Sequence, residues 1–443
     1  MTSTHRDHFD YGGGQAKVAH VGIFDFTGAF REKRLSSAAF QSHLETGWRF
    51  IDALPYWMYD ETCFAEKGFQ DEAVAIDNQS LRPYPFEADA CLAVADYTGP
   101  SAEISPRRVL QRLTDRATEL GFVAVGGFEY ETIFLDEDGG SLRAKSWGDL
   151  VPSLPHNRCW SGLAPAADAT FLKTIHDQLT SAGISLDHHC MELGPGCVEY
   201  CLGPESILKA SDDAALFKVF TKAIARSHGK TASFLAQLDA GFPGLGGHLS
   251  ISLRAPDGTL LFHDAQTPHR LSEVAMWFLG GVLKLTPELM CMFAPTVNGY
   301  RRLRPGNWAP RSANWGVGNY SCGMRAVSHT PEETRLEFRL PGADASAHVV
   351  SAMVLGAGLW GIENHIDPGA PVSGNGRLAE PAPGADLPTS LEEAARRFSE
   401  SGPAREIFGE GLVNHYAAWC RAEAAAFHAH VSAFERARYL ETV

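Results

Sequence analysis

The sequence predicts an α+β fold, in which helices and antiparallel strands alternate irregularly along a chain of 443 residues. Some segments alternate apolar with polar residues at every second position, as half-buried strands do; FEYETIFL at 128–135 and GGHLSISL at 246–253 are examples. Other segments repeat apolar residues every three or four positions, as amphipathic helices do. The sequence contains no internal repeat. A mixed fold of separate helices and strands follows from these observations.

The N-terminal part is expected to form a small unit of its own. Short strand-like runs and turns fill residues 17–100, with one short helix at 37–47, and the unit ends near Gly99-Pro100. The whole chain is long enough for two or more domains with sizeable cores. We therefore expect a first domain at residues 1–103 and a second, larger domain at 104–443.

The second domain is expected to begin with a helix. Ser105 can cap this helix, Pro106 suits its first turn, and apolar residues recur on one face before Gly121. The further expected elements are a strand at 122–135, amphipathic helices at 166–182 and 213–228, strands at GGHLSISL and TRLEFRL, a surface loop at 369–387 and a mostly helical tail at 388–443.

Composition and charge narrow the function classes. The net charge of -15 and the pI of about 5.6 argue against nucleic acid or an anionic membrane as the main partner. The polar N-terminus lacks the apolar core of a secretory signal. No run reaches the ~18 apolar residues of a spanning helix, since Lys284, Pro287 and Glu288 interrupt the nearest one at 276–297. We expect a cytoplasmic protein that binds neither nucleic acid nor membranes.

The cysteines are odd in number, scattered, and form no CxxC pair. Reduced thiols in a cytoplasmic protein are the expected interpretation. The alternative is a zinc cluster of Cys190, Cys197 and Cys201 near His188 and His189, although this spacing fits no common zinc finger. The nine cysteines are Cys63, Cys91, Cys159, Cys190, Cys197, Cys201, Cys291, Cys322 and Cys420.

Carboxylates gather at strand positions. Glu129 and Glu131 are two residues apart, so an extended strand carries both on one face. Glu192 and Glu199 flank a Gly-Pro-Gly turn, and His248 follows a glycine-rich stretch. Each carboxylate taken alone is explained by partial exposure or by a nearby arginine. Several carboxylates together need a stronger remedy, because unpaired buried carboxylates are costly.

A divalent cation is that remedy for the set. Glu337 adds a further carboxylate, between Arg335 and Arg339 on one strand face. Oxygen-rich ligands with one imidazole suit Mg²⁺ or Mn²⁺ better than zinc. These two arginines, together with Arg302 and Arg325, would bind anions, because a guanidinium fork fits phosphate and carboxylate. Metals combined with arginines indicate phosphoryl transfer.

The order of six motifs resembles the glutamine synthetase family. These motifs are FEYE, MELGPGCVE, GLGGHLSISL, APTVNGYRRLRPGNWAP, NYSCGMR and RLEFRLPGADAS. The resemblance covers nearly the whole chain, from FDFTGAFREKRL to VSAFERARYLE. It implies an N-terminal β-grasp domain and a catalytic domain with a curved antiparallel sheet that forms a funnel. It also implies a ring-shaped homo-oligomer, a decamer or dodecamer, with active sites shared between neighbouring subunits.

The resemblance also implies roles for the matching residues. Two divalent cations, Mg²⁺ or Mn²⁺, would have separate ligand sets. One set is Glu131, Glu192 and Glu199, and the other is Glu129, His248 and Glu337. The remaining matches are Arg302 and Arg339 for the substrate's carboxylates and the transferring phosphate, Arg325 and Arg335 for the nucleotide phosphates, and Gly244 for the amino-acid end of the substrate.

The reaction that the resemblance implies has two steps. ATP phosphorylates the side-chain carboxylate of glutamate, and an amine then attacks the acyl phosphate and expels phosphate. The cations would neutralise the triphosphate, and the arginines would stabilise the charge that develops.

Trp308 departs from the family pattern in a way that bears on the amine. Glutamine synthetase proper carries a flap glutamate at this position of the PGNWAP motif, and an indole cannot accept a proton. The N-terminal domain also lacks the Asp-Gly-Ser-Ser motif of the family's ammonium pocket and has an aromatic run at 56–64 instead. Aromatic faces suit an organic amine better than ammonium. The alternatives are loop packing for Trp308, and core or subunit contacts for the aromatic run.

Other departures fall in the nucleotide and acid sites. Tyr320 stands at the position of a phosphate-binding arginine, and Ser250 at that of the second histidine of an HxH motif. Gln237 replaces a lysine, and Pro243 replaces an asparagine. The family's NPY after the last motif is Ser346-Ala347-His348. We expect Tyr320 and Ser250 to contact the nucleotide, with a weakened or changed use of ATP as one outcome.

The function that we expect is an ATP-dependent ligase that joins the γ-carboxylate of glutamate to an organic amine. The alternatives are glutamine synthetase using ammonium, a ligase of a different acid, and a non-catalytic binding protein. Glu192 is the expected base for the attacking amine, and the reserves are Asp60, Glu61, His188 and His189.

Overall fold

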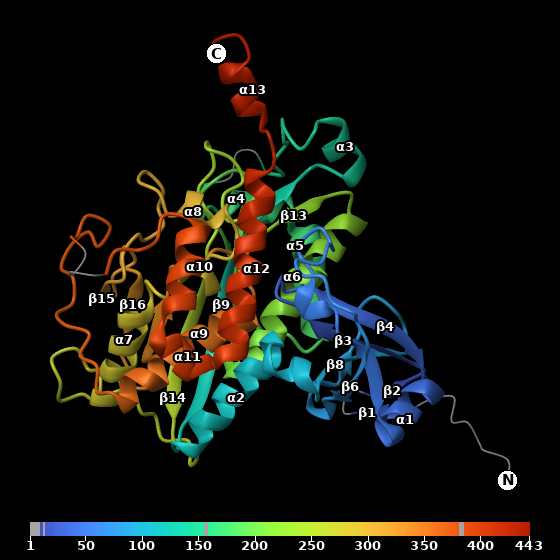
Figure 1. The fold of residues 1–443 in the computed structure, drawn as a ribbon, viewed down its shortest axis with the longest axis horizontal. Coiled ribbons are helices and arrows are strands. Elements are labelled where there is room, and N and C mark those ends of the chain that lie inside the picture. The colour runs from blue at the N-terminus through green and yellow to red at the C-terminus, as the bar shows by residue number, and fades with distance from the viewer. Residues whose placement is uncertain (1–8, 12–13, 155–157, 381–384) are drawn as a thin grey trace.

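The computed structural model of the chain describes residues 9–11, 14–154, 158–380 and 385–443 (Figure 1). Helices and strands are mixed, so the predicted α+β class is confirmed. A small N-terminal sheet, blue in Figure 1, stands beside a larger part that is built on a curved sheet. The expected boundary at 103/104 falls between η3 (Pro100–Glu103) and α2 (Pro106–Glu119), and it stays a prediction.

The N-terminal sheet lies in the order β4-β3-β8-β6-β5, with β7 paired to β8. β3 and β8 run parallel, whereas the other neighbours are antiparallel. Phe40 of the expected short helix packs into the same core as Trp48 and Val74. The elements of this part are β1 (Phe9–Tyr11), β2 (Gly14–Ala16), β3 (Val18–Phe24), β4 (Phe30–Ser36), α1 (Ser37–Thr46), β5 (Trp48–Ile51), η1 (Leu54–Tyr56), β6 (Asp71–Ile76), η2 (Asn78–Ser80), β7 (Arg82–Pro83) and β8 (Ala90–Tyr97).

The larger sheet has the strand order β10-β11-β9-β14-β17-β16-β15, and β12 and β13 also pair with β9. Its neighbours are antiparallel except for β15 and β16, which run parallel. The strands are β9 (Val123–Leu135), β10 (Leu186–Met191), β11 (Cys197–Leu202), β12 (Glu205–Ser206), β13 (Thr231–Ser233), β14 (Gly247–Arg254), β15 (Trp315–Val317), β16 (Met324–Val327) and β17 (Arg335–Phe338).

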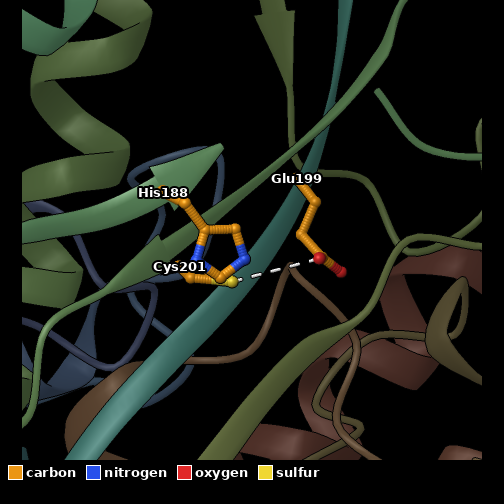
Figure 2. A group of neighbouring side chains, drawn as sticks. All are labelled: His188, Glu199 and Cys201. Carbon is orange, nitrogen blue, oxygen red and sulfur yellow. Dashed lines mark hydrogen bonds between the residues drawn. The ribbon is translucent and has the colours of Figure 1, made fainter. Parts of the chain in front are cut away.

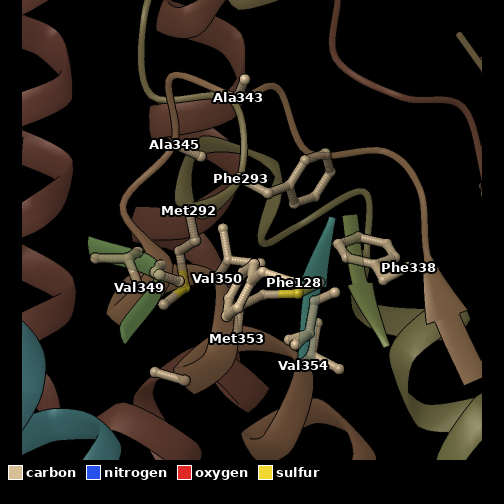
Figure 3. Close-up of a cluster of buried hydrophobic side chains, with 14 of the residues drawn as sticks. Phe128, Met292, Phe293, Phe338, Ala343, Ala345, Val349, Val350, Met353 and Val354 are labelled. Atoms are coloured by element: carbon tan, nitrogen blue, oxygen red, sulfur yellow. The ribbon is translucent and has the colours of Figure 1, made fainter. Parts of the chain in front are cut away.

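The alternation along β9 separates the two faces of this sheet. Phe128 and Tyr130 are buried in the core, where Phe128 and Phe338 pack with residues of α9 (Ala347–Glu363) (Figure 3). Glu129 and Glu131 point to the opposite face, where they line a cavity. A slip of one residue would move both glutamates into the core, so burial of the aromatic rings fixes the register.

A layer of helices covers the apolar face of the sheet. Among these helices, α6 contacts β9, and α2, α6 and α7 contact α9. A Cβ atom on Gly281 of α7 would lie only 2.5 Å from the Cα atom of Gly361 of α9, so the two backbones touch. Besides α2 and α9, the helices of the larger part are α3 (Gly139–Ala144), α4 (Leu163–Ala167), α5 (Ala169–Ser181), α6 (Ile207–Ser227), α7 (Glu273–Leu285), η4 (Met290–Met292), α8 (Gly299–Arg302), α10 (Leu391–Glu400), α11 (Gly402–Phe408), α12 (Glu410–His428) and α13 (Ala433–Tyr439).

The expected helices are present, but three details of the expectation were wrong. Ser105 precedes α2 as expected, yet its hydroxyl donates to Asp96 Oδ1 at 2.6 Å and does not cap the helix. The helix expected at 166–182 is divided into α4 and α5 at Asp168, whose backbone leaves the helical region. The helix expected at 213–228 begins earlier, at Ile207. The expected loop at 369–387 contains no helix or strand among its described residues, and 381–384 lie outside them.

Buried ion pairs join the N-terminal sheet to the larger part. Arg107 of α2 makes two bonds to the Asp212 carboxylate, at 2.8 and 2.9 Å, and a third bond to Asp77 at 2.6 Å. His348 Nε2 lies 2.9 Å from Asp212 Oδ1, so one carboxylate of α6 links α2 with α9. Arg107 and His348 keep the pKa of Asp212 well below its usual value despite burial. This network therefore holds the carboxylate charged inside the core.

The C-terminal helices pack on the outside of the larger part, and α10 and α12 lie side by side (Figure 1). The aromatic run at 56–64 contacts α12: Trp419 Nε1 donates to the carbonyl of Trp57 at 3.0 Å, and Tyr56 packs on His415. Contact with the core of its own chain is therefore the observed environment of this run. None of the helices in the described ranges is long and apolar enough to cross a bilayer.

Candidate active site

A cavity of about 1160 Å³ lies on the polar face of the larger sheet. Carboxylates from β9 and β11 form one wall, and arginines from β16 and β17 form the other. Three loops complete its rim with Trp160, Trp308 and Tyr320. The expected site residues that line the cavity are Glu129, Glu131, Glu192, Glu199, Trp308, Tyr320, Arg325, Arg335 and Arg339.

The strand register brings the glutamates and the histidine together from distant parts of the sequence. Glu131 of β9 is paired with Glu199 of β11, and Glu129 is paired with His248 of β14. One possible ligand atom from each of Glu129, Glu199 and His248 lies within 4.8 Å of the others. This group takes members from both expected ligand sets, so the two sets adjoin each other.

His248 has a buried ring nitrogen at a distance where it could bind a cation. Its Nδ1 is buried without a hydrogen-bond partner among the described residues, at 3.6 Å from Glu129 Oε2 and 3.7 Å from Glu337 Oε1. Burial holds the pKa of His248 well below its usual value, and Arg339 acts in the same direction. The ring is therefore neutral and keeps a lone pair for a metal ion.

The carboxylates in this corner of the cavity repel one another electrostatically. Burial, together with the carboxylates of Glu129, Glu131 and Glu192, raises the pKa of Glu199 to about 8. Burial also raises the pKa of Glu131, whose carboxylate accepts a hydrogen bond from the backbone N–H of Gly246. A divalent cation would relieve both effects, and the donor set of carboxylates and one imidazole fits Mg²⁺ or Mn²⁺.

Glu337 lies just beneath the cavity lining and is fully buried. Arg325 Nη1 donates to its Oε2 at 2.7 Å, and Arg339 donates to its other oxygen. The two guanidinium groups thus neutralise Glu337 while they face the cavity. The sequence placed Arg339 on the strand face of Glu337, and their ion pair agrees with that placement, whereas the contact with Arg325 was not expected.

Three further expected residues lie behind the lining. Arg302 is buried and donates to the carbonyl of Leu340 at 2.8 Å. Gly244 lies against it, because a Cβ there would come within 2.5 Å of Arg302 Cγ. Ser250 sits in the sheet between Gly127 and Glu337, and its hydroxyl has no partner among the described residues. The structure therefore gives Gly244 a packing reason for being a glycine.

Aromatic rings replace charged groups at the cavity rim. The Trp308 side chain is 51% exposed, and the guanidinium carbon of Arg377 lies 4.2 Å from its ring centroid. Tyr320 is equally exposed and contacts Arg325 and Arg339 through its ring face. Both rings are held by arginines rather than packed into the core.

The expected bases are not all brought to the cavity. Glu192 lines it and accepts a 2.7 Å hydrogen bond from the backbone N–H of Leu193, and His188 lies at the rim. His189 is on the opposite face of β10, near Tyr200. In the N-terminal part, Asp60 binds Thr62 and Glu61 binds Arg31. Asp60, Glu61 and His189 are therefore outside the lining within this chain.

Sequence reasoning missed several lining residues. Cys159, Cys190 and Cys201 line the cavity beside the glutamates, together with His269, Asn319 and the loop at 371–374. The period-two alternation of His188 and Cys190 along β10, which continues to Glu192 just beyond it, is the signal that could have placed Cys190 on the cavity face. All nine cysteines lie in the described residues and none forms a disulfide, as expected for reduced thiols.

The family model of the glutamine synthetase catalytic domain matches residues 103–439. The chain belongs to the glutamine synthetase family. The match begins at Glu103, three residues before α2 begins at Pro106, and ends at Tyr439, the last residue of α13. The family depends on ATP and divalent metal ions, and the carboxylates and imidazole described above are candidate ligands in this member.

The curated relatives include ligases that act on organic amines and glutamine synthetases. A glutamate–isopropylamine ligase of a Pseudomonas species is 31% identical over 96% of this chain and 95% of its own length. A type-1 glutamine synthetase 2 of Dictyostelium discoideum is 32% identical over 95% of this chain and 82% of its own length. The γ-glutamylethanolamide synthetase GlnA4 of Streptomyces coelicolor is 31% identical over 85% of this chain and 80% of its own length.

Solved structures support the fold. The structure of apo GmaS without ligand superposes with a TM-score of 0.84 over 96% of this chain and 97% of that one, at 24% identity. The expected fold of an N-terminal strand domain followed by a glutamine synthetase catalytic domain is confirmed.

Proposed function

We propose that this enzyme phosphorylates the γ-carboxylate of glutamate with ATP and transfers the γ-glutamyl group to an organic amine. The observation that carries this proposal is the position of Trp308, an exposed indole at the rim of a cavity whose floor combines carboxylates and arginines. Two of the relatives named above join glutamate to an organic amine, isopropylamine in one case and ethanolamine in the other. Ammonium as the substrate is less favoured, because Trp308 offers no carboxylate to take its proton.

The carboxylates would hold two hard cations, Mg²⁺ or Mn²⁺, in the ligand sets expected from the sequence. Glu131, Glu192 and Glu199 would form one set, and Glu129, His248 and Glu337 the other. The unpartnered Nδ1 of His248 and the raised pKa of Glu199 support this assignment. Bound cations would supply charge neutralisation for the triphosphate and the transferring phosphoryl group.

The arginines would position the anionic parts of both substrates. Arg325 and Arg335 face the cavity from neighbouring strands and would bind the nucleotide phosphates. Arg339 would stabilise the charge that develops on the phosphoryl group as it moves to the γ-carboxylate. Arg302 lies behind this wall and would act on the substrate only if its guanidinium swings past Glu131.

On the amine side, the rim would exclude water and select the nucleophile. One face of the Trp308 ring is covered by Arg377, so its remaining surface is available to an alkyl group. Exclusion of water protects an acyl phosphate from hydrolysis until the amine attacks. Glu192 lines the cavity and would accept the amine's proton through the carboxylate oxygen that does not bind the cation, and His188 is the other expected base in the lining.

The experiment that tests this function measures ADP release by the full chain with glutamate, ATP, Mg²⁺ or Mn²⁺, and a panel of amines. The panel contains isopropylamine, ethanolamine, putrescine and ammonium. We expect turnover with at least one organic amine to exceed turnover with ammonium at least tenfold. Turnover with ammonium alone would indicate a glutamine synthetase. An inactive chain that also fails to bind Mg²⁺–nucleotide would indicate a binding protein.

We also propose a ring-shaped homo-oligomer in a reducing, cytoplasmic setting. Large apolar side chains are exposed beside the cavity, including Trp160, Leu163 and Leu193, and others lie along the C-terminal segment that carries α13. α13 projects away from the rest of the chain (Figure 1). A neighbouring subunit would cover these surfaces. Light scattering coupled to gel filtration measures the assembly size, and a monomer would contradict the proposal.

A further inference from the structure

Three side chains at one edge of the cavity form a cluster that the proposed reaction does not use as a unit. His188 comes from β10, and Glu199 and Cys201 come from β11 (Figure 2). One possible ligand atom of each lies within 4.8 Å of the others, and Cys201 Sγ is 3.9 Å from Glu199 Oε1. The strand pairing places His188 directly opposite Cys201, and Glu199 and Cys201 share a strand face.

The histidine of this cluster is oriented by a second carboxylate. Asp187 Oδ2 lies 3.2 Å from His188 Nδ1, and because a carboxylate oxygen can only accept, this contact favours the tautomer with its proton on Nδ1 and its lone pair on Nε2. A carboxylate behind a histidine is the usual arrangement around metal-binding imidazoles, because it fixes the tautomer and increases the basicity of the ligand nitrogen. His188 therefore has a carboxylate behind its ring, as metal-binding histidines usually do.

The donor chemistry of this cluster differs from that of the proposed cation pair. One thiol, one imidazole and one carboxylate suit Zn²⁺, whereas Mg²⁺ and Mn²⁺ prefer oxygen ligands. Bond lengths of about 2.0–2.3 Å to zinc place tetrahedral ligand atoms roughly 3–4 Å apart, so small side-chain rotations suffice. Cys190 Sγ lies 3.6 Å from the same oxygen of Glu199 and offers a fourth ligand in place of water.

We propose that His188, Glu199 and Cys201 form a zinc site that shares Glu199 with the proposed hard-cation site. Its ligands are different from the cluster of three cysteines considered from the sequence, since Cys197 and His189 are not part of it. Cys201 releases its thiol proton to solvent as the zinc–sulfur bond forms. Zinc binding withdraws Glu199 from the hard cations and suppresses the ligase reaction, and this last effect rests on the proposed function.

Metal binding to the full chain tests the site directly. Co²⁺ is added as an optical substitute for zinc, and the thiolate-to-cobalt charge-transfer band in the near ultraviolet is recorded. We expect wild-type protein to show this band and Zn²⁺ to abolish it by displacement. The C201S variant should lose at least about half of the band's intensity, because only Cys190 could still supply a thiolate, and its zinc affinity, measured by competition with a chelating dye, should fall at least about tenfold.

Two further variants separate a built site from adventitious thiol binding. C63S removes an exposed thiol of the N-terminal part and should leave both the band and the zinc affinity unchanged. D187N should keep the band but weaken zinc binding by roughly tenfold, because Asp187 acts through His188. A wild-type spectrum without the band, or a band that C190S removes and C201S does not, overturns the proposal.

The activity measurement distinguishes this proposal from the proposed function. With Mn²⁺ held constant, zinc should inhibit ADP release by the wild type, and C201S should need about ten times more zinc for the same fractional inhibition. Each variant is compared with its own zinc-free rate. Absence of ADP release with every amine would refute the ligase function but leave the cobalt spectrum as evidence for the site. An active enzyme without the cobalt band would refute the site alone.

Discussion

The guanidinium carbon of Arg325 lies 3.9 Å from the centroid of the Tyr320 ring, and that of Arg339 lies 5.3 Å from it. Tyr320 stands where the family resemblance places a phosphate-binding arginine. Its ring cannot bind phosphate as a cation does, but it stacks on two arginines that can. At this position a tyrosine ring that packs on two arginines therefore stands in place of a guanidinium group that would bind phosphate directly.

The nucleotide affinity should depend on this ring rather than on the phenol hydroxyl. We expect Y320A to raise the Kd for Mg²⁺–ATP by about 5- to 30-fold, since it removes two exposed cation–π contacts of roughly 0.5–1 kcal/mol each. Y320F keeps the ring and should stay within about twofold of wild type. Calorimetric titration with a non-hydrolysable ATP analogue gives both values. An equal loss in the two variants would instead assign the role to the hydroxyl group.

Removing the imidazole of the cation site should reduce Mn²⁺ binding. We expect H248A to weaken Mn²⁺ by at least about tenfold, because the variant removes a proposed ligand and leaves Glu129 and Glu337 with one donor fewer. Free Mn²⁺ is measured by electron paramagnetic resonance. The control is H430A, which removes an exposed histidine near the C-terminus. Unchanged Mn²⁺ affinity in H248A would exclude His248 as a ligand.

A carboxylate at the rim should change the choice of amine. We expect W308E to lower kcat/KM for the best organic amine about tenfold and to raise the rate with ammonium, since the glutamate can accept a proton while the apolar contact is lost. W160E places the same charge at another exposed tryptophan of the cavity and serves as the matched control. Equal effects of both variants would point to a general charge effect.

Asp96 should make the stability of the protein depend on pH. Its Oδ1 accepts from Ser105, its Oδ2 has no partner among the described residues, and burial raises the pKa of Asp96 from 3.8 to about 6. The native state thus holds a proton that the unfolded state has lost, so stability falls as pH rises from about 4 to 6. The shift corresponds to roughly 3 kcal/mol.

The variant D96N should abolish this dependence and stabilise the protein at pH 7 by about 1–3 kcal/mol. Urea unfolding at several pH values between 4 and 7 provides the measurement. The matched control is D177N, because Asp177 is exposed on α5 and, within the described part of the chain, its ion-pair partner is Lys173. A parallel pH dependence in D96N and wild type would rule out Asp96 as its source.

Loss of the Asp212 carboxylate should weaken the packing of α2, α6 and α9, which it joins. We expect D212A to lower the free energy of unfolding by about 3–5 kcal/mol, because Arg107 is left buried with Asp77 as its remaining carboxylate partner. D115A, on the exposed side of α2, should change it by less than about 0.5 kcal/mol. A change in D212A as small as that in D115A would show that water replaces the carboxylate.

Local patterns were sufficient to predict much of the fold. The alternation around Glu129 indicated β9 and its two faces, because a strand with one buried face carries a period of two. The division at Asp168 and the early start of α6 were not predictable, since tertiary packing sets such ends. α9 was missed because it is buried almost all around and so lacks the polar stripe that marks an amphipathic helix.

The site was predictable to the extent that motifs mark positions. Motif order assigned the carboxylates, but the sequence could not show that Arg302 lies behind the cavity wall or that Gly244 packs against it. Such facts depend on how the strands curve and on which side chains reach past their neighbours. The sequence suggested Cys190, Cys197 and Cys201 near His188, but only the strand pairing shows that Cys201 lies directly opposite His188.

The contact of Gly281 with Gly361 has a mechanical consequence. The backbones of α7 and α9 are in direct contact there, so these two helices leave little room to slide past each other. Glu129, Glu199 and His248 lie on β9, β11 and β14 of the sheet that these helices cover. We therefore expect any movement that admits substrates to involve the rim loops that carry Trp160, Trp308 and Tyr320 rather than the sheet.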